Sequence, residues 1–215
     1  VSSLKNFCDE NKEFSKIELK KYKKIKYSNS LNEISESNTY IVALPTPIDK
    51  KKKPNLKYIT SACKDLAKII NKGDLIIFES TVYPGLTEEI CIPILEMISK
   101  KRVNKDFHIG YSPERINPGD KKNNLRNITK IISASDKGSL KRMRKIYSKV
   151  CKKVFSAESI KIAEGAKIIE NIQRDVNIAL INELSIAFDK LDINFSSVLK
   201  AASTKWNFQN YTPGL

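Results

Sequence analysis

The chain has 215 residues, of which 40% are hydrophobic, and its formal net charge is +15, from 39 Lys and Arg against 24 Asp and Glu. This length and hydrophobic content predict a packed core and exclude wholesale disorder. No apolar run approaches the roughly 20 residues that cross a bilayer. We therefore expect no membrane partner and a cytoplasmic location.

The excess positive charge comes mainly from lysines, which are spread along the whole chain. Proteins that read nucleic-acid phosphates favour clustered arginines and interleaved aromatic residues, and neither is present. We therefore expect no nucleic-acid partner, although a basic binder whose affinity falls steeply with salt stays open as an alternative.

The chain has four cysteines, which are far apart in the sequence and contain no CxxC spacing: Cys8, Cys63, Cys91 and Cys151. His108 is the single histidine, so the sequence has no recognisable zinc site, and we expect no metal. Reduced thiols in a cytoplasmic protein are the expected state.

Hydrophobic periodicity predicts a polar helix over residues 15–24, and from residue 30 strands and helices alternate. The expected strands are 40–44, 75–78, 107–110, 130–134 and 154–155. The expected helices between them are 58–71, 87–99 (with a kink at Pro93) and 137–150. Strand, helix and strand in this order predict right-handed crossovers and a parallel sheet. The fold class is therefore α/β, with a partial Rossmann-like parallel sheet.

Three polar, Pro- or Gly-rich loops directly follow predicted strands. They are PTPID after 40–44, ESTVYPG at 79–85 and YSPERINPGD at 111–120. Open α/β sheets place their chemistry at the carboxyl edge of the strands. Three such loops make an enzyme the first hypothesis.

A single helix without proline is expected over residues 159–191. Its apolar residues fall on one stripe: Ile162, Ile169, Ile172, Val176, Leu180, Ala187 and Leu191. Its polar residues, on the opposite side, are Glu164, Lys167, Asn171 and Arg174. A helix longer than 30 residues spans about 45 Å, so we expect it to link two domains or to pack against its counterpart in a dimer.

Lys167 and Asn171 lie four residues apart, with Arg174 one turn further along the same helical side. A Lys and an Asn together can hold and polarise an alcohol or carbonyl oxygen, and a solvated polar face is the alternative. Glu114 is a candidate base or water-orienting group, or else the partner of Arg115 in a surface salt bridge. Thr81 is a candidate to hold a water or a cofactor amide, or else a turn residue or helix cap.

Five long motifs resemble the bacterial nucleotide-sugar 6-dehydrogenases of the UDP-glucose/GDP-mannose dehydrogenase family, and within it the branch acting on UDP-N-acetylhexosamines. They are VALPTPID, ESTVYPGLTEE, GYSPERINPGD, AKIIENIQRDVNIALINEL and AASTKWNF. The resemblance implies that two NAD⁺ oxidise the C6 hydroxyl of a UDP-sugar to the uronic acid, for surface polysaccharide biosynthesis. The intermediate aldehyde is held on a cysteine and released by hydrolysis of a thioester.

The resemblance also implies site residues, a nucleotide-sugar partner and a homodimer through the helix 159–191. Lys167 and Asn171 would stabilise the substrate oxygen, and Glu114 and Thr81 would place the hydrolytic water. The residues expected at the cofactor are Pro45, Thr46, Ser80, Thr81 and Glu114. Those expected at the UDP-sugar are Arg115, Ile116, Lys167, Asn171 and Arg174, with the segment 204–206.

The chain also departs from the family pattern, because it has no GxGxxG turn and none of its cysteines stands in a GGHC-type loop. We expect residues 1–156 to form an incomplete NAD-binding domain that lacks its first βαβ unit. Residues 157–215 are expected to form a helical dimerisation domain, with the C-terminal UDP-binding domain absent. This predicts a truncated piece that does not complete the second oxidation.

Besides the basic nucleic-acid binder, two alternatives stay open. One is a β-hydroxyacid dehydrogenase, since that class also places Lys and Asn four apart on a long helix. The other is a non-catalytic dimerisation module. The enzyme hypothesis requires Lys167, Asn171 and Arg174 to face the same cleft as the tips of the sheet.

Overall fold

The computed structural model describes residues 1–11, 14–22, 24–116 and 123–214. Residues 117–120 of the YSPERINPGD motif lie outside the described residues. In chain order the elements are α1 (Ser2–Lys5), α2 (Lys16–Lys21), η1 (Leu31–Ile34), β1 (Thr39–Val42), α3 (Lys57–Leu66), β2 (Asp74–Phe78), η2 (Thr87–Cys91), α4 (Ile92–Ser99), β3 (Phe107–Tyr111), β4 (Thr129–Ala134), α5 (Lys137–Tyr147), β5 (Lys153–Ser156), α6 (Ile160–Asp189) and α7 (Phe195–Ala202).

The strands form one sheet in the order β1-β2-β3-β4-β5, and every strand begins and ends within two residues of its predicted range. Three neighbouring pairs are parallel, but β3 and β4 are antiparallel, through Gly110 opposite Ala134 and Tyr111 opposite Ser133. The prediction of an all-parallel sheet is therefore wrong at this pair. The described residues between β3 and β4 contain no crossover helix, so the chain simply turns back.

This reversal decides which loops meet. The carboxyl ends of β1, β2 and β3 share one edge of the sheet, and the amino ends of β4 and β5 lie at that same edge. The three loops singled out in the sequence therefore converge there. We call this edge the carboxyl edge.

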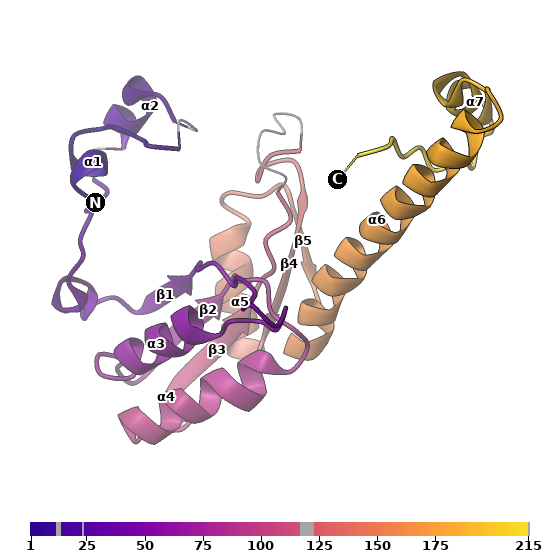
Figure 1. Cartoon of the computed structure of the whole chain (residues 1–215). Helices are drawn as coiled ribbons and strands as arrows, with labels where there is room; N and C mark the ends of the chain where they lie inside the picture. Colours follow the sequence, from indigo (N-terminus) through magenta and orange to yellow (C-terminus); the bar gives the residue numbers. More distant parts are fainter. Residues whose placement is uncertain (12–13, 23, 117–122, 215) are drawn as a thin grey trace.

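The core lies on both faces of β2, whose five residues are all buried. Ile76 and Phe78 pack in the cluster that contains residues of α3 and α4, whereas Leu75 and Ile77 pack with Met143 of α5. Figure 1 shows α3 and α4 on one face of the sheet and α5 on the other. A strand covered on both faces is expected to be a continuous apolar run, and residues 75–78 of β2, LIIF, form one after Asp74.

Two helices differ from their predicted form. α3 ends at Leu66, five residues before the predicted end at 71, and tighter turns carry the chain to Gly73, whose φ of +87° forms the turn into β2. The segment 87–99 begins as a π-helix, η2, and becomes α-helical at Ile92. Pro93 has no N–H for the ordinary helical ladder, which explains the wider turn just before it.

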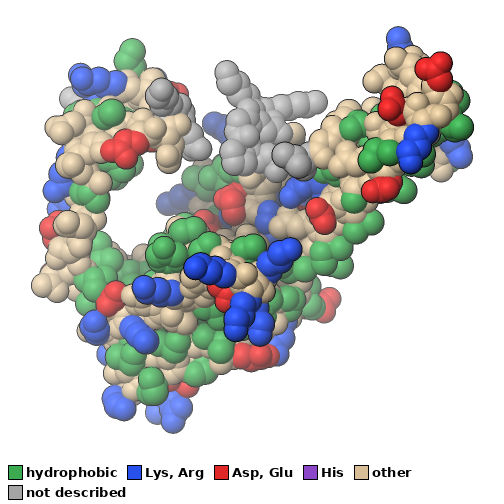
Figure 2. Space-filling view, viewed as in Figure 1, with side chains coloured by type: hydrophobic (Ala, Val, Ile, Leu, Met, Phe, Trp, Pro, Cys, Tyr) green, Lys and Arg blue, Asp and Glu red, His purple; other side chains and the backbone are tan. Residues whose placement is uncertain are grey.

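The long helix is confirmed as α6, and the Oγ of Ser159 caps it by accepting the N–H of Ile162 at 3.2 Å. Figure 1 shows α6 passing the sheet and then projecting away from it, with α7 at its far end. Much of its predicted apolar stripe is at least half exposed, at Ile162, Ile169, Ile172, Val176, Leu180 and Leu191. Figure 2 shows hydrophobic side chains along this helix.

The N-terminal residues form a small lobe set apart from the sheet in Figure 1. The helix predicted over 15–24 is the shorter α2, which begins with a capping box between Ser15 and Glu18. Within the described part of the chain, no helix has both the length and the apolar character to cross a membrane.

Candidate active site

Hydrogen bonds fix the first two strand-end loops against each other. The Thr46 hydroxyl donates to the Thr81 carbonyl at 2.6 Å, and the Leu44 N–H donates to the Ser80 hydroxyl at 3.0 Å. The phenol of Tyr111 at the end of β3 donates to the Ser80 carbonyl at 3.1 Å. The loops after β1 and β2 and the end of β3 are therefore one connected unit.

Thr81 is half-buried in this unit, and its hydroxyl makes no hydrogen bond to any described residue. Ser80 is buried and its hydroxyl is used within the protein, whereas Pro45 is exposed beside Thr46. Among these four residues, only the Thr81 side chain offers a polar group that is held in place and unpaired within the described structure.

Glu114 follows β3 and has a fixed carboxylate. Its Oε1 accepts the N–H groups of Arg115 and Ile116 at 2.7 and 2.6 Å. Its Oε2 faces the Nζ of Lys130 at 3.7 Å, and the side chain is 44% exposed. The carboxylate is thus oriented by its own loop on one side and open to solvent on another.

Arg115 joins this loop to α6. Its guanidinium pairs with Glu170, with Nη2 to Oε1 at 2.8 Å and Nε to Oε2 at 3.2 Å, and also donates to the Thr129 carbonyl at 2.7 Å. A two-point pair of this kind fixes orientation as well as distance. The alternative in which Arg115 pairs with Glu114 is wrong, because each of the two has a different ionic partner.

Glu164 makes a second connection between α6 and the sheet. Its side chain is fully buried and accepts the N–H groups of Gly85 at 2.6 Å and Thr87 at 3.1 Å, where η2 begins. Burial raises the pKa of Glu164, although the hydrogen bonds from Thr87 and Gly85 lower it. Helical periodicity predicted Glu164 on the polar side of the helix together with Lys167. In the structure Glu164 is buried instead, because the free N–H groups at the start of η2 provide it with hydrogen-bond partners.

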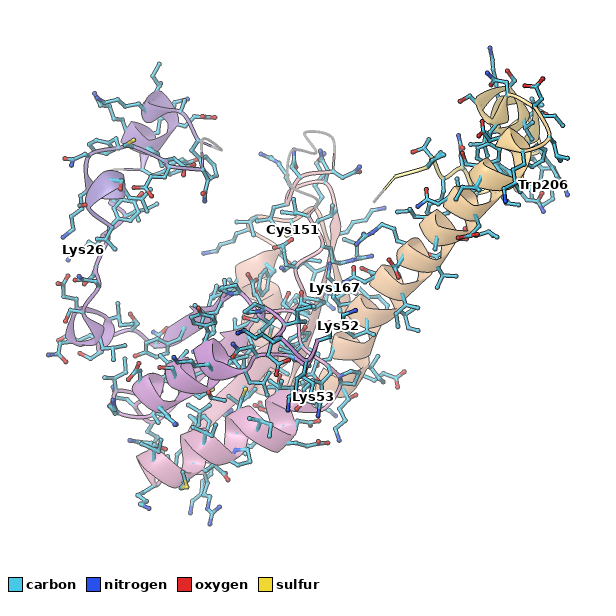
Figure 3. The ribbon with its side chains drawn as sticks, viewed as in Figure 1. Lys26, Lys52, Lys53, Cys151, Lys167 and Trp206 are labelled. Atoms are coloured by element: carbon cyan, nitrogen blue, oxygen red, sulfur yellow. The ribbon has the colours of Figure 1, made fainter. Side chains whose placement is uncertain are left out.

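Lys167 lies between these two connections and is half-buried. Burial lowers its pKa, and so do the nearby guanidinium groups of Arg174 and Arg115, while the carboxylates of Glu170 and Glu114 raise it. Figure 3 shows Lys167 on the part of α6 that passes the sheet. The helix therefore brings this amine within electrostatic reach of the loop after β3.

Asn171 and Arg174 lie further along α6. The guanidinium of Arg174 donates to the Oδ1 of Asn171 at 3.0 Å, and no contact from either side chain to the strand-end loops is found among the described residues. Both line a surface hollow with Ile172, Asp175 and Ile178. Trp206, in the segment 204–206, is 91% exposed and lies at the far end of α6 in Figure 3.

The sequence did not indicate a buried polar cluster at the same edge. Lys130 of β4 is 1% exposed, and its Nζ lies 3.2 Å from the Oε1 of Glu79 and 3.3 Å from the Pro113 carbonyl. The phenol of Tyr147 donates to the same Glu79 oxygen at 2.5 Å, and its ring lies 5.5 Å from the ammonium. A single lysine inside an apolar strand was the available signal.

The cysteines do not join this site as a metal centre. Cys63, Cys91 and Cys151 are buried and Cys8 is exposed, all as free thiols. Within the described residues, no group of three or more His, Cys, Asp or Glu side chains has the arrangement of a metal site.

Comparison with known proteins matches both parts of the chain to one family. Residues 11–151 match the NAD binding domain of the UDP-glucose/GDP-mannose dehydrogenase family, and residues 161–215 match the central domain of that family. The whole chain aligns at 47% identity with UDP-N-acetyl-D-glucosamine 6-dehydrogenase of Salmonella typhi, and at 48% with Protein CapL of Staphylococcus aureus. The alignments cover 51% of each relative, so the chain spans about half the length of these proteins.

Comparison with solved structures also finds nucleotide-sugar dehydrogenases. The UDP-D-ManNAc dehydrogenase of Pyrococcus horikoshii superposes with a TM-score of 0.85 at 30% identity, covering 93% of this chain and 47% of that one. The GDP-mannose dehydrogenase of Pseudomonas aeruginosa superposes at 0.88 and 17% identity, over 97% and 50% of the two chains, which supports the fold alone. The chain belongs to the UDP-glucose/GDP-mannose dehydrogenase family.

Proposed function

We propose that this chain provides part of an NAD-dependent 6-dehydrogenase that oxidises the C6 hydroxyl of a UDP-N-acetylhexosamine to the uronic acid. The observation that carries the proposal is that α6, fixed to the loop after β3 by the Arg115–Glu170 pair, brings Lys167 within electrostatic reach of Glu114 and Arg115. An amine of lowered pKa within electrostatic reach of a fixed carboxylate suits proton exchange with a substrate alcohol. The identity to a UDP-N-acetyl-D-glucosamine 6-dehydrogenase supports the choice of substrate.

NAD supplies the hydride acceptor for both oxidations when it is bound. The described residues at the carboxyl edge fit a polar group of this cofactor. The Thr81 hydroxyl, which has no hydrogen-bond partner among the described residues, can bind a polar group of the cofactor. Thr46 and Ser80 connect the two loops on either side of it. Pro45 gives the first loop its extended path. No GxGxxG turn for the pyrophosphate occurs in the 215 residues.

In the proposed mechanism Lys167 and Asn171 bind the C6 oxygen and stabilise it as its charge changes. Arg115, Ile116 and Arg174 bind the remaining nucleotide sugar, whose diphosphate is an anion that arginine recognises well. Glu114 and Thr81 would hold the water that hydrolyses the thioester left by the second oxidation and so releases the uronic acid. The Glu114 carboxylate already has the fixed orientation that such a role requires.

The test uses a chimera in which residues 1–215 replace the matching half of the Salmonella typhi relative, with formation of NADH as the measurement. We expect turnover of UDP-N-acetylglucosamine, and a loss of about 100-fold or more in Lys167→Ala. Lys161→Ala is the matched control, because this exposed lysine of α6 forms its one ion pair within the described part of the chain with the exposed Glu89.

Near-normal turnover in Lys167→Ala would refute the assigned role. Turnover of small hydroxyacids in place of nucleotide sugars would favour a β-hydroxyacid dehydrogenase. A wild-type chimera that fails to oxidise either class would favour the non-catalytic module.

We further propose that the chain divides near residue 156, between β5 and α6, into a nucleotide-binding part and a helical part. The exposed apolar stripe of α6 supports a homodimer formed through residues 159–191, since an unpartnered face of this size is costly in water. The product would supply surface polysaccharide synthesis in the cytoplasm, where NAD is available.

A further inference from the structure

The polar cluster around Lys130 joins four elements at the carboxyl edge. Lys130 comes from β4, Glu79 from the end of β2, Tyr147 from the end of α5 and Glu114 from the loop after β3. Glu114 has a role in the proposed mechanism, but the other three residues do not touch the proposed substrate region. Their arrangement therefore needs a separate explanation.

An ammonium group that is 99% buried is stable only if it is paired and hydrogen-bonded, because removing it from water is costly. Glu79 is its main ionic partner, at 3.2 Å and 16% exposed, and the Pro113 carbonyl and the face of Tyr147 complete its surroundings. The contact with Glu114 is longer, at 3.7 Å, and more exposed. Glu79 and Tyr147 thus hold Lys130, and Lys130 in turn reaches Glu114.

The two oxygens of Glu114 are held in different ways. The N–H groups of Arg115 and Ile116 bind Oε1, whereas Lys130, at 3.7 Å, is the one cation among the described residues that lies within 4 Å of Oε2. Rotation about the terminal bond of a glutamate is soft, so a contact on one oxygen leaves the carboxylate plane free to turn. The attraction of Oε2 to the buried Lys130 ammonium at 3.7 Å favours one orientation of that plane.

We propose that Lys130 is a positioning residue that sets the orientation of the Glu114 carboxylate, with Glu79 and Tyr147 holding its ammonium in place. The inference rests on the proposed function for the role of Glu114, but the positioning itself is testable without turnover. Its effect on the reaction passes through Glu114 alone.

The first test uses the chain itself and measures amide hydrogen exchange by NMR. In Lys130→Met we expect the amides of Arg115 and Ile116 to exchange about tenfold faster, because the carboxylate that binds them is released. Lys130→Arg keeps the charge and should stay within about twofold of the wild type. The amides of Gly85 and Thr87, held by Glu164, are the internal control and should not change.

An unchanged exchange rate of the Arg115 and Ile116 amides in Lys130→Met would overturn the proposal. Equal acceleration at the control amides of Gly85 and Thr87 would also overturn it, because it would indicate a general loosening of the structure. If Lys130→Met alone does not fold, the double variant Lys130→Met/Glu79→Gln removes the unpaired buried carboxylate and is measured in the same way.

The second test measures steady-state kinetics in the chimera described above. Lys130→Met should lower kcat about 100-fold, the scale expected for a displaced catalytic group, with KM nearly unchanged and recovery in Lys130→Arg. The double variant Lys130→Met/Glu114→Gln should be no slower than Glu114→Gln, because both changes act through one carboxylate. Losses that multiply would overturn the proposal.

The two tests separate the proposal from the proposed function. A wild-type chimera without nucleotide-sugar turnover would count against the function, while the exchange data would still decide whether Lys130 orients Glu114.

Discussion

Replacing Glu164 by alanine tests how α6 is attached to the sheet. The variant leaves the N–H groups of Gly85 and Thr87 without their acceptor in a fully buried position. Each unpaired buried N–H costs about 1–3 kcal/mol. Part of this loss is offset because a charge no longer needs to be buried, so we expect the free energy of unfolding to fall by about 2–4 kcal/mol.

The pH dependence of this loss has a definite sign. Burial raises the pKa of Glu164 above its ordinary value of 4.5, so the folded protein binds this proton more tightly than the unfolded chain does. The stability that the shift contributes is therefore fully present below the unfolded pKa and is lost as pH rises through the folded pKa. The difference in unfolding free energy between wild type and Glu164→Ala should be larger at about pH 4 than at about pH 8.

Urea unfolding followed by circular dichroism at both pH values measures the effect. Glu89→Ala is the control, since Glu89 is exposed, lies on η2 near the same contact and should leave the unfolding midpoint unchanged. A loss below about 1 kcal/mol at both pH values, or a difference that grows with pH, would refute the account of Glu164.

Three other predictions follow from single residues. Gly165→Ala should raise the free energy of unfolding, measured in urea, by roughly 0.5–1 kcal/mol, because alanine favours a helix more than glycine does. The added Cβ has room, since it would lie 3.8 Å from the Cγ of Pro84, an ordinary van der Waals contact. Lys167, with its lowered pKa, should react with acetic anhydride faster at mildly alkaline pH than the exposed Lys190, as measured by mass spectrometry; equal rates would contradict the shift. Ile172→Glu should convert a dimer to a monomer in sedimentation velocity, and an unchanged sedimentation coefficient would exclude the apolar stripe of α6 as the interface.

Local signals explain how much of the fold was predictable. The run DLIIF predicted β2, and the long period of apolar residues without proline predicted α6. Periodicity gives no information on where the chain turns back between elements, so the antiparallel β3–β4 pair was missed. The absence of a helical pattern between those strands was the overlooked signal.

Contacts around the candidate site were predictable where both partners lie in one loop or on one helix, as with Asn171 and Arg174, and less so where distant segments meet. Helical periodicity placed Glu164 with the polar residues because it counts only the helix itself. Its buried partners are Gly85 in the loop after β2 and Thr87 at the start of η2, and the partners of Lys130 come from three other elements. Such contacts depend on tertiary packing, which overrides the local pattern.

The position of Lys167 follows from two contacts that α6 makes on either side of it. Glu164, three residues before it, is bound by the loop after β2, and Glu170, three residues after it, is bound by Arg115 in the loop after β3. Residues three apart are neighbours on a helix, and one helical segment between two fixed points has little freedom to rotate. The backbone of Lys167 is therefore held between the two loops, and its amine lies within electrostatic reach of Glu114 and Arg115, although no hydrogen bond of the Lys167 side chain itself is found among the described residues.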